Sequence, residues 1–229
     1  MSDGKVWMRD VTKVYHRGDE SLTVLDRLTL EIPSGAFFAL MGPSGSGKST
    51  ILNLIGGLDR PDSGTIEVGA DEITGMSSHQ LAAWRARHVG FVFQAFNLIP
   101  VLTALENVEL PLLLQPLSRS ERRKHAEYAL EIMGLKDRMN HRPAQLSGGQ
   151  EQRVAIARAI ATDPSVIVAD EPTGDLDRAS ADHVLDILRK LSADSKKTVI
   201  MVTHDPAAAE YAQRTLHLKK GAVVHEGAA

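Results

Sequence analysis

Cysteine is absent from all 229 residues of the sequence. Disulfide bonds and thiolate metal sites are therefore excluded, and a chain without cysteine is compatible with a reducing compartment. Long apolar runs are absent as well, although a helix that crosses a bilayer needs roughly 18 such residues. The longest candidate, Leu110–Leu114, is far shorter and is interrupted by Pro111. If the protein works at a membrane, we expect another chain to supply the membrane-spanning segments.

No secretory signal is predicted from the first residues, and neither sign of charge is in large excess. Its first ten residues include Asp3, Lys5, Arg9 and Asp10 and have no apolar core. Lysine and arginine together number 26 and aspartate and glutamate 29, which gives a net charge of −3. This balance argues against a broad basic face, so no nucleic-acid partner is predicted. Hydrophobic residues at 43% and charged residues at 24% are typical of a soluble globular protein.

Short apolar runs alternate with helical patterns along most of the chain. Four continuous runs are typical of strands buried on both faces of a parallel sheet: Ala36–Met41, Val89–Phe93, Val166–Ala169 and Thr198–Val202. Two partly alternating strands precede them, Val6–Val11 and Leu28–Ile32. Helical patterns follow the first run (Ser49–Leu58) and precede the last (Asp182–Leu191). This order predicts an α/β fold with a mainly parallel sheet.

The middle of the chain, from about 105 to 161, shows helical patterns and no convincing strand. Ser118 and Glu121 have the spacing of a capping box, and the helix that they begin should end near Gly134. Its apolar stripe is Ala126, Leu130 and Met133. We expect a helical subdomain inserted between strands of the sheet.

Each predicted buried strand is followed by residues that carry chemistry. A glycine loop follows Met41, Gln94 follows Phe93, Asp170 and Glu171 follow Ala169, and Thr203 and His204 follow Val202. Ligands of open α/β sheets bind beyond the carboxyl ends of the strands. We therefore expect these groups to meet at one edge of the sheet.

The glycine loop matches the phosphate-binding pattern G-x-x-x-x-G-K-[ST], with a strand before it and a helix after it. It comprises Gly42, Pro43, Ser44, Gly45, Ser46, Gly47, Lys48, Ser49 and Thr50. Its glycines allow backbone N–H groups to surround phosphate oxygens, and the helix adds the positive end of its dipole. Lys48 should reach the β- and γ-phosphates, and the Ser49 hydroxyl should bind Mg²⁺. A nucleoside triphosphate with Mg²⁺ is thus the predicted ligand of this loop.

Two carboxylates at the end of the third buried strand suit the same reaction. Asp170 is the expected partner of Mg²⁺, and Glu171 beside it can polarise the attacking water as a general base. A second anion site is predicted at Leu146-Ser147-Gly148-Gly149-Gln150, which precedes the helical pattern Glu151–Ala161. Free N–H groups and the helix dipole favour an anion there.

Taken in order, these segments resemble the motifs of ABC-family ATPases over nearly the whole chain. The segments are Gly42–Thr50 (Walker A), Gln94 (Q-loop), Leu146–Gln150 (signature), Val166–Glu171 (Walker B), Gly174–Asp177 (D-loop) and His204 (H-loop). The resemblance implies a P-loop NTPase core of the RecA-like type, an N-terminal antiparallel β subdomain and an α-helical insertion. We expect residues 1–229 to form one nucleotide-binding domain, with the helical subdomain and its signature at about 95–162.

The resemblance also implies a head-to-tail homodimer with each ATP between one subunit's Walker A and the other's signature. Ser147, Gly148, Gly149 and Gln150 would then face the partner's nucleotide. His204 would hold the γ-phosphate and Lys48 would act with it in catalysis. Gln94 would contact Mg²⁺ and water, Asp175 and Asp177 would lie at the dimer seam, and Tyr15 would stack on adenine.

Within the family, the stretches at 56–64, 90–100 and 102–112 look like the LolD/MacB type, which serves lipoprotein release and macrolide export. Such ATPases lie on the cytoplasmic face of the membrane and drive a permease with few spans and a large extracytoplasmic domain. Apolar residues after Gln94 would line the groove for this permease, whereas Leu110–Leu114 is predicted to belong to the core. Glu151 departs from the family, which usually has glutamine there.

Two alternatives remain open at this point. One is a regulatory ATPase that resembles FtsE and controls a cell-envelope enzyme. The other is a soluble ABC ATPase that acts on nucleic acid, which is disfavoured because the chain has neither a long coiled-coil insertion nor a second cassette. The cargo, the direction of transport and the permease are not encoded in these motifs.

Overall fold

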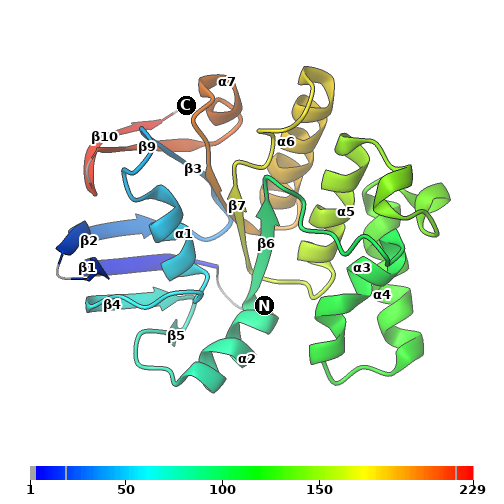
Figure 1. The fold of residues 1–229 in the computed structure, drawn as a ribbon, viewed down its shortest axis with the longest axis horizontal. Helices are drawn as coiled ribbons and strands as arrows, with labels where there is room; N and C mark the ends of the chain where they lie inside the picture. Colours follow the sequence, from blue (N-terminus) through cyan, green and yellow to red (C-terminus); the bar gives the residue numbers. More distant parts are fainter. Residues whose placement is uncertain (1–3, 19, 220, 229) are drawn as a thin grey trace.

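The chain folds into two β-sheets, with α1 packed between them and further helices on the other face of the larger sheet, as seen in Figure 1, a computed structural model that describes residues 4–18, 20–219 and 221–228. The smaller sheet is antiparallel and has the strand order β2-β1-β4-β5. Its strands are β1 (Val6–Arg17), β2 (Glu20–Ile32), β4 (Ser63–Val68) and β5 (Asp71–Glu72). The antiparallel β subdomain expected near the N-terminus is therefore present.

The larger sheet has the strand order β10-β9-β3-β8-β7-β6 and is parallel except for β10. Its strands are β3 (Phe37–Met41), β6 (Val89–Phe93), β7 (Val166–Asp170), β8 (Thr198–Val202), β9 (Arg214–Lys219) and β10 (Ala222–Ala228). The sequence predicted the four adjacent strands β3, β8, β7 and β6 and missed β9 and β10. In β9 only Leu216 and Leu218 are buried, so it has no continuous apolar run.

The parallel sheet is buried on both faces, because alternate residues of each strand enter different apolar clusters. Phe37 and Ala39 of β3 pack with the helical side, whereas Phe38 and Leu40 pack toward the antiparallel sheet. The second cluster also holds α1 (Lys48–Ile55) and α2 (Ser78–His88). This double burial explains why these strands appear in the sequence as continuous apolar runs.

The helices between β6 and β7 form the expected insertion, which Figure 1 shows beside the larger sheet. They are α3 (Ala104–Glu109), η1 (Leu110–Leu114), α4 (Arg119–Ile132), η2 (Lys136–Arg138), η3 (Pro143–Gln145) and α5 (Gly148–Ile160). Two further helices, α6 (Arg178–Ala193) and α7 (Pro206–Ala209), follow β7 and β8. In the part of the chain that the structure describes, none of the helices combines the length and apolar character that a membrane crossing requires.

The Ser118–Glu121 capping box is present at the start of α4, and the predicted stripe of that helix is buried. The prediction that Leu110–Leu114 belongs to the core is correct for Leu112, which is fully buried. It is wrong for Leu113 and Leu114, which are 58% and 73% exposed. This segment is a 3₁₀ helix, whose three residues per turn direct successive side chains to different sides.

Candidate functional site

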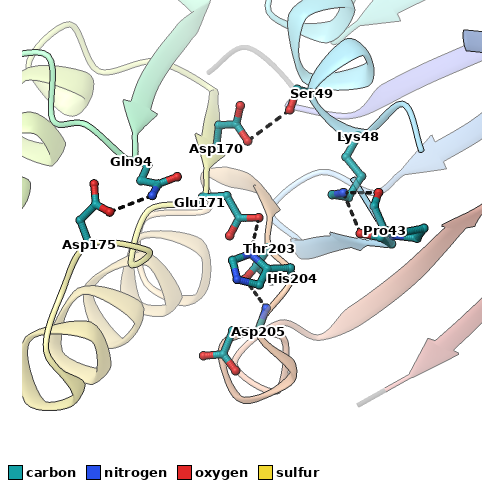
Figure 2. Close-up of polar contacts among 11 residues, drawn as sticks. Pro43, Lys48, Ser49, Gln94, Asp170, Glu171, Asp175, Thr203, His204 and Asp205 are labelled. Carbon is teal, nitrogen blue, oxygen red and sulfur yellow. Dashed lines mark hydrogen bonds and ion pairs between the residues drawn. The ribbon is translucent and has the colours of Figure 1, made fainter. Parts of the chain in front are cut away.

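The carboxyl ends of β3, β6, β7 and β8 meet at one edge of the larger sheet, and the residues after them gather there (Figure 2). A cavity of about 690 Å³ opens at this edge. It is lined by the glycine loop from Gly42 to Thr50 except Ser46, by Asp170, Glu171 and His204, and by Leu22, Val24 and Val202. Its size is in the range that binds a small-molecule ligand.

The glycine loop joins β3 to α1 through backbone conformations that other residues rarely adopt. Gly42, Gly45 and Gly47 have φ angles of 149°, 76° and 99°. A Cβ atom at Gly42 would also collide with the carbonyl oxygen of Leu218 in β9. The loop ends where α1 begins at Lys48, and its N-cap residue Gly47 supplies no side-chain hydrogen bond to the first N–H groups of that helix. This is the backbone geometry that binds phosphate oxygens.

Lys48 is 8% exposed, and its ammonium group is held by the loop itself. Its Nζ donates to the carbonyl oxygens of Gly42, at 2.7 Å, and Pro43, at 3.0 Å. Both acceptors are neutral carbonyl oxygens, so neither hydrogen bond neutralises the charge of the ammonium. A phosphate group bound in the loop would supply an anionic acceptor for Lys48.

Ser49 and Asp170 approach each other across the cavity. The Ser49 hydroxyl donates to Asp170 Oδ1 at 3.5 Å, a long hydrogen bond (Figure 2). Burial, together with the charge of Glu171, raises the pKa of the Asp170 carboxyl despite the hydrogen bond from Ser49 and the charge of Lys48. A hydroxyl and a carboxylate oxygen are ligands that Mg²⁺ accepts, and a cation would stabilise the charge that burial disfavours.

Glu171 and His204 form a pair on neighbouring strands. His204 Nδ1 lies 2.9 Å from Glu171 Oε1, and the nitrogen must be the donor because a carboxylate can only accept. The Glu171 side chain is 19% exposed and that of His204 is 76% exposed. The backbone of Glu171 is left-handed, with φ at 48°, and its N–H donates to Val202. This strained backbone directs the carboxylate toward the cavity, where it could activate a water molecule.

Gln94, which was predicted to contact Mg²⁺ and water, is bonded to the predicted D-loop residue Asp175. Its Nε2 donates to Asp175 Oδ1 at 2.8 Å, and both residues are exposed (Figure 2). The structure therefore brings the predicted Q-loop and D-loop residues together. Asp177, expected at a dimer seam, caps the N-terminus of α6 by accepting from the N–H of Ser180 at 3.0 Å.

The segment Ser147–Gln150 lies at the N-terminus of α5, as predicted, but does not line the cavity beside the glycine loop. Ser147 is the N-cap residue, and its side chain and that of Gln150 each bond to the other's backbone N–H. Helix α5 begins at Gly148, earlier than predicted. Ser147 and Gly149 line a separate hollow of about 340 Å³ with Arg153 and the first turns of α6. The two helix N-termini that the sequence predicts as anion sites therefore line separate cavities of the same chain.

Tyr15 lies near the cavity without lining it. It pairs with Leu22 across β1 and β2, and its hydroxyl donates to Asp59 Oδ2 at 2.8 Å. The sequence analysis missed Leu22 and Val24, which line the cavity from β2. Leu22 is 65% exposed. It could have been predicted as a cavity residue because it is apolar and lies on the strand next to Tyr15, the predicted base-stacking residue.

A glycine loop between a buried strand and a helix, with a carboxylate pair at the end of a neighbouring strand, defines a nucleoside triphosphate-binding protein of the P-loop class. A family described as ABC transporter matches residues 25–174, which is more than half of the chain. The chain belongs to the ABC transporter family and is its ATPase component.

Three relatives show where in the family the chain falls. It is 48% identical to the ABC transporter ATP-binding protein MJ0796 of Methanocaldococcus jannaschii over 96% of this chain and 95% of that protein. A structure described as the dimeric post-hydrolysis state of MJ0796 bound to ADP and Pi superposes with a TM-score of 0.89, at 46% identity, and covers 97% of this chain and 98% of that one.

The other two relatives belong to the group that the sequence resembled. The macrolide export ATP-binding/permease protein MacB of Rhodopseudomonas palustris is 47% identical over 100% of this chain, which spans 35% of that longer protein. The lipoprotein-releasing system ATP-binding protein LolD of Chromohalobacter salexigens is 44% identical over 92% of this chain and 89% of that protein. The resemblance to the LolD/MacB type is thereby confirmed.

Proposed function

We propose that the protein hydrolyses ATP as a head-to-tail homodimer and thereby drives a separate membrane permease. The observation that carries the proposal is that the N-termini of α1, at Lys48, and of α5, at Ser147, line two separate cavities of one chain, although both are predicted to bind the phosphates of a nucleotide. A two-fold dimer brings each end of one subunit against the other end of its partner, which completes two sites with the same surface. The dimeric description of MJ0796 supports this arrangement.

In each site, the residues of the glycine loop would bind the phosphates and Lys48 would exchange its two carbonyl partners for phosphate oxygens. Ser49 and Asp170 would hold Mg²⁺, which supplies charge neutralisation at the phosphates. Glu171 would accept a proton from the attacking water. His204 would keep the Glu171 carboxylate in place and donate to the γ-phosphate as the partner subunit's Ser147 and Gly149 close over it.

The surface for the permease would be a groove of about 450 Å³ between α2, β6, η1 and α5. Its lining is mostly apolar and includes Phe91, Phe93 and the exposed Leu114. It also includes Arg85 and Arg158, and no acidic residue lines it. Both guanidinium groups are bonded to backbone carbonyls, of Gly57 and of Phe96 and Asn97. We infer that a permease helix with one carboxylate among apolar side chains would fill this groove.

The relatives named above connect such ATPases with macrolide export and lipoprotein release, so we place this chain in export, lipoprotein release or force transmission. The permease would have few spans and a large extracytoplasmic domain, and the ATPase would bind it at the cytoplasmic face of the cell membrane. An FtsE-like regulatory role uses the same site and differs in what the permease controls.

Replacing the proposed base tests the dimer directly. Glu171→Gln keeps the size and polarity of the side chain but cannot accept the proton, so ATP and Mg²⁺ should trap a dimer that sedimentation velocity detects. Lys48→Ala combined with Glu171→Gln is the matched control and should stay monomeric because phosphate binding is weakened. A Glu171→Gln protein that remains monomeric with ATP and Mg²⁺ at high protein concentration would contradict the two-site arrangement.

The trapped dimer also tests the partner. Tagged Glu171→Gln protein with ATP and Mg²⁺ is incubated with detergent-solubilised membranes of the source organism, and bound proteins are identified by mass spectrometry. Recovery of a few-span protein with a large extracytoplasmic domain is expected. Recovery of soluble or nucleic-acid-associated proteins alone would leave the ATPase in place and overturn the permease.

A further inference from the structure

We propose that Asp59 and Lys13 form an ionic clip that fixes the ring of Tyr15 in position for the base of the nucleotide. The proposal rests on the proposed function, because it takes Tyr15 as the residue on which the base stacks. Neither Asp59 nor Lys13 was singled out from the sequence. Both would be positioning residues, since they act on the nucleotide through Tyr15.

The carboxylate of Asp59 receives three donors from two parts of the fold. Lys13 Nζ donates to Oδ1 at 2.8 Å, the N–H of Arg60 donates to the same oxygen at 2.7 Å, and the Tyr15 hydroxyl donates to Oδ2 at 2.8 Å. Asp59 lies in the loop that follows α1, whereas Lys13 and Tyr15 lie on β1. The carboxylate therefore joins the helix of the phosphate loop to the strand that carries the ring.

Lys13 contributes more than a surface ion pair. It is 8% exposed, and its Nζ also donates to the carbonyl oxygen of Arg60 at 2.7 Å. The same ammonium lies 5.0 Å from the centroid of the Tyr15 ring, which is a cation–π contact. Because the ammonium of Lys13 covers one face of the ring, the base of the nucleotide would stack on the opposite face. Tyr15 is 39% exposed.

The charges within the clip support one another. Burial alone would raise the pKa of the Asp59 carboxyl, but hydrogen bonds from Lys13, the Arg60 backbone and Tyr15 together hold that pKa below its ordinary value. Burial and the hydrogen bond to Asp59 raise the pKa of the Tyr15 hydroxyl, although a hydrogen bond with the Thr50 side chain opposes this. The clip is therefore an ionised carboxylate with a neutral phenol at neutral pH.

Helix α1 begins in the glycine loop and Asp59 follows that helix, so the clip connects the phosphate-binding end of α1 to the strand that carries Tyr15. The nucleotide would bind through its phosphates at the glycine loop and through its base at Tyr15. The loss of conformational entropy on binding is smaller if the loop and the ring are already held at a fixed separation. The clip sets that separation before the nucleotide arrives. Leu22, opposite Tyr15 on β2 and lining the cavity, extends the apolar surface available to the base.

The test compares ATP with tripolyphosphate, a ligand that keeps the phosphates and lacks the base. Both oxygens of the Asp59 carboxylate accept hydrogen bonds. Asp59→Asn keeps only one acceptor oxygen, so either Lys13 or Tyr15 loses its hydrogen bond to residue 59. By isothermal titration calorimetry with Mg²⁺, this variant should bind ATP roughly three- to thirtyfold more weakly. Its affinity for tripolyphosphate should change by less than about twofold, because the phosphate loop is intact.

Tyr15→Phe tests whether Asp59 acts through the tyrosine hydroxyl. It keeps the ring and removes the donor, so it should lower ATP affinity in the same selective way, and the double variant should be no weaker than Asp59→Asn alone. Glu67→Gln is the matched control, since it breaks an ion pair with Arg9 on the same antiparallel sheet, away from the cavity. It should bind both ligands like the unmodified protein.

Two outcomes would overturn the clip. One is an Asp59→Asn protein with unchanged ATP affinity. The other is an equal loss of affinity for ATP and for tripolyphosphate. That result would show that Asp59 stabilises the fold or the phosphate loop and does not act on the base. Lys48→Ala tests the proposed function separately, because it should lower the affinity for both ligands. Unchanged binding in that variant would contradict the proposal that the glycine loop binds phosphate.

Discussion

At the scale of single residues, Glu171 and His204 show how the fold creates a pair that neither side chain could form by itself. His204 is mostly exposed and follows β8, whereas Glu171 is mostly buried and follows β7. Pairing of β7 with β8 in parallel register places them side by side. The hydrogen bond with Glu171 and the charge of that residue raise the pKa of His204 above its ordinary value.

The pair makes a prediction that nuclear magnetic resonance can check. In the nucleotide-free protein His204 should titrate above the ordinary pKa of 6.5, and in Glu171→Gln its pKa should return toward that value because the negative charge is gone. The signal is assigned by its loss in His204→Asn. An unshifted His204 in the unmodified protein would contradict the pair.

The sign of the effect on stability follows from the raised pKa. The favourable interaction is fully present below the ordinary pKa of His204 and is lost as the pH rises through the higher pKa of the folded state. Because the imidazole is 76% exposed, solvent screens the pair and the contribution to the free energy of unfolding is small. The larger consequence is local: above that pH Glu171 loses a charged partner.

At the scale of elements, the close approach of β6 and α5 links the sheet to the helical insertion. Gly90 in β6 lies so near α5 that a Cβ atom there would overlap the carbonyl oxygen of Ala159. The φ of Gly90 is ordinary, so the reason for glycine is space and not backbone conformation. The same contact lines one wall of the groove proposed for the permease.

Substitution of Gly90 should therefore be costly. Gly90→Ala must push α5 away from the sheet, and overpacking of this kind lowers the free energy of unfolding by about 1–3 kcal/mol. Urea denaturation followed by circular dichroism measures the loss. Gly75→Ala is the matched control, because nothing lies within 4 Å of a Cβ atom there and its φ is not positive. Equal free energies of unfolding for the two variants would show that α5 can move away from β6 without loss of stability.

At the scale of the whole molecule, the proposed function uses two surfaces that would face other chains: the two helix N-termini at the cavities and the groove. Two adjacent leucines in η1 differ in whether they line this groove. Leu114 lines the groove and is 73% exposed, whereas Leu113 is 58% exposed and does not line it. A pair of equivalent substitutions can therefore separate binding of the permease from general effects on the surface.

Leu114→Asp should bind ATP and form the Glu171→Gln dimer normally but fail to retain the permease in the pull-down, since it places a carboxylate where an apolar contact is needed. Leu113→Asp should retain it. Once the permease is known, Arg85→Glu should abolish binding, and exchange of the facing carboxylate for lysine should restore it. Retention by Leu114→Asp would place the permease elsewhere.

The sequence by itself determined the central strands, the phosphate loop and the acidic end of β7. These features depend on local patterns: apolar runs mark strands with both faces buried, and the glycine spacing of the loop is specific to one backbone geometry. The antiparallel sheet was inferred only through resemblance, and β9 was missed because only two of its six residues are buried.

Only the tertiary structure decided which distant groups meet. It paired Gln94 with Asp175, and it separated Ser147 from the glycine loop of the same chain. It also brought Asp59 to Lys13 and Tyr15 across 44 residues or more. The physical reason is that a side chain's partners depend on strand order and loop packing, which join segments far apart in the sequence, whereas a motif records only neighbours along the chain.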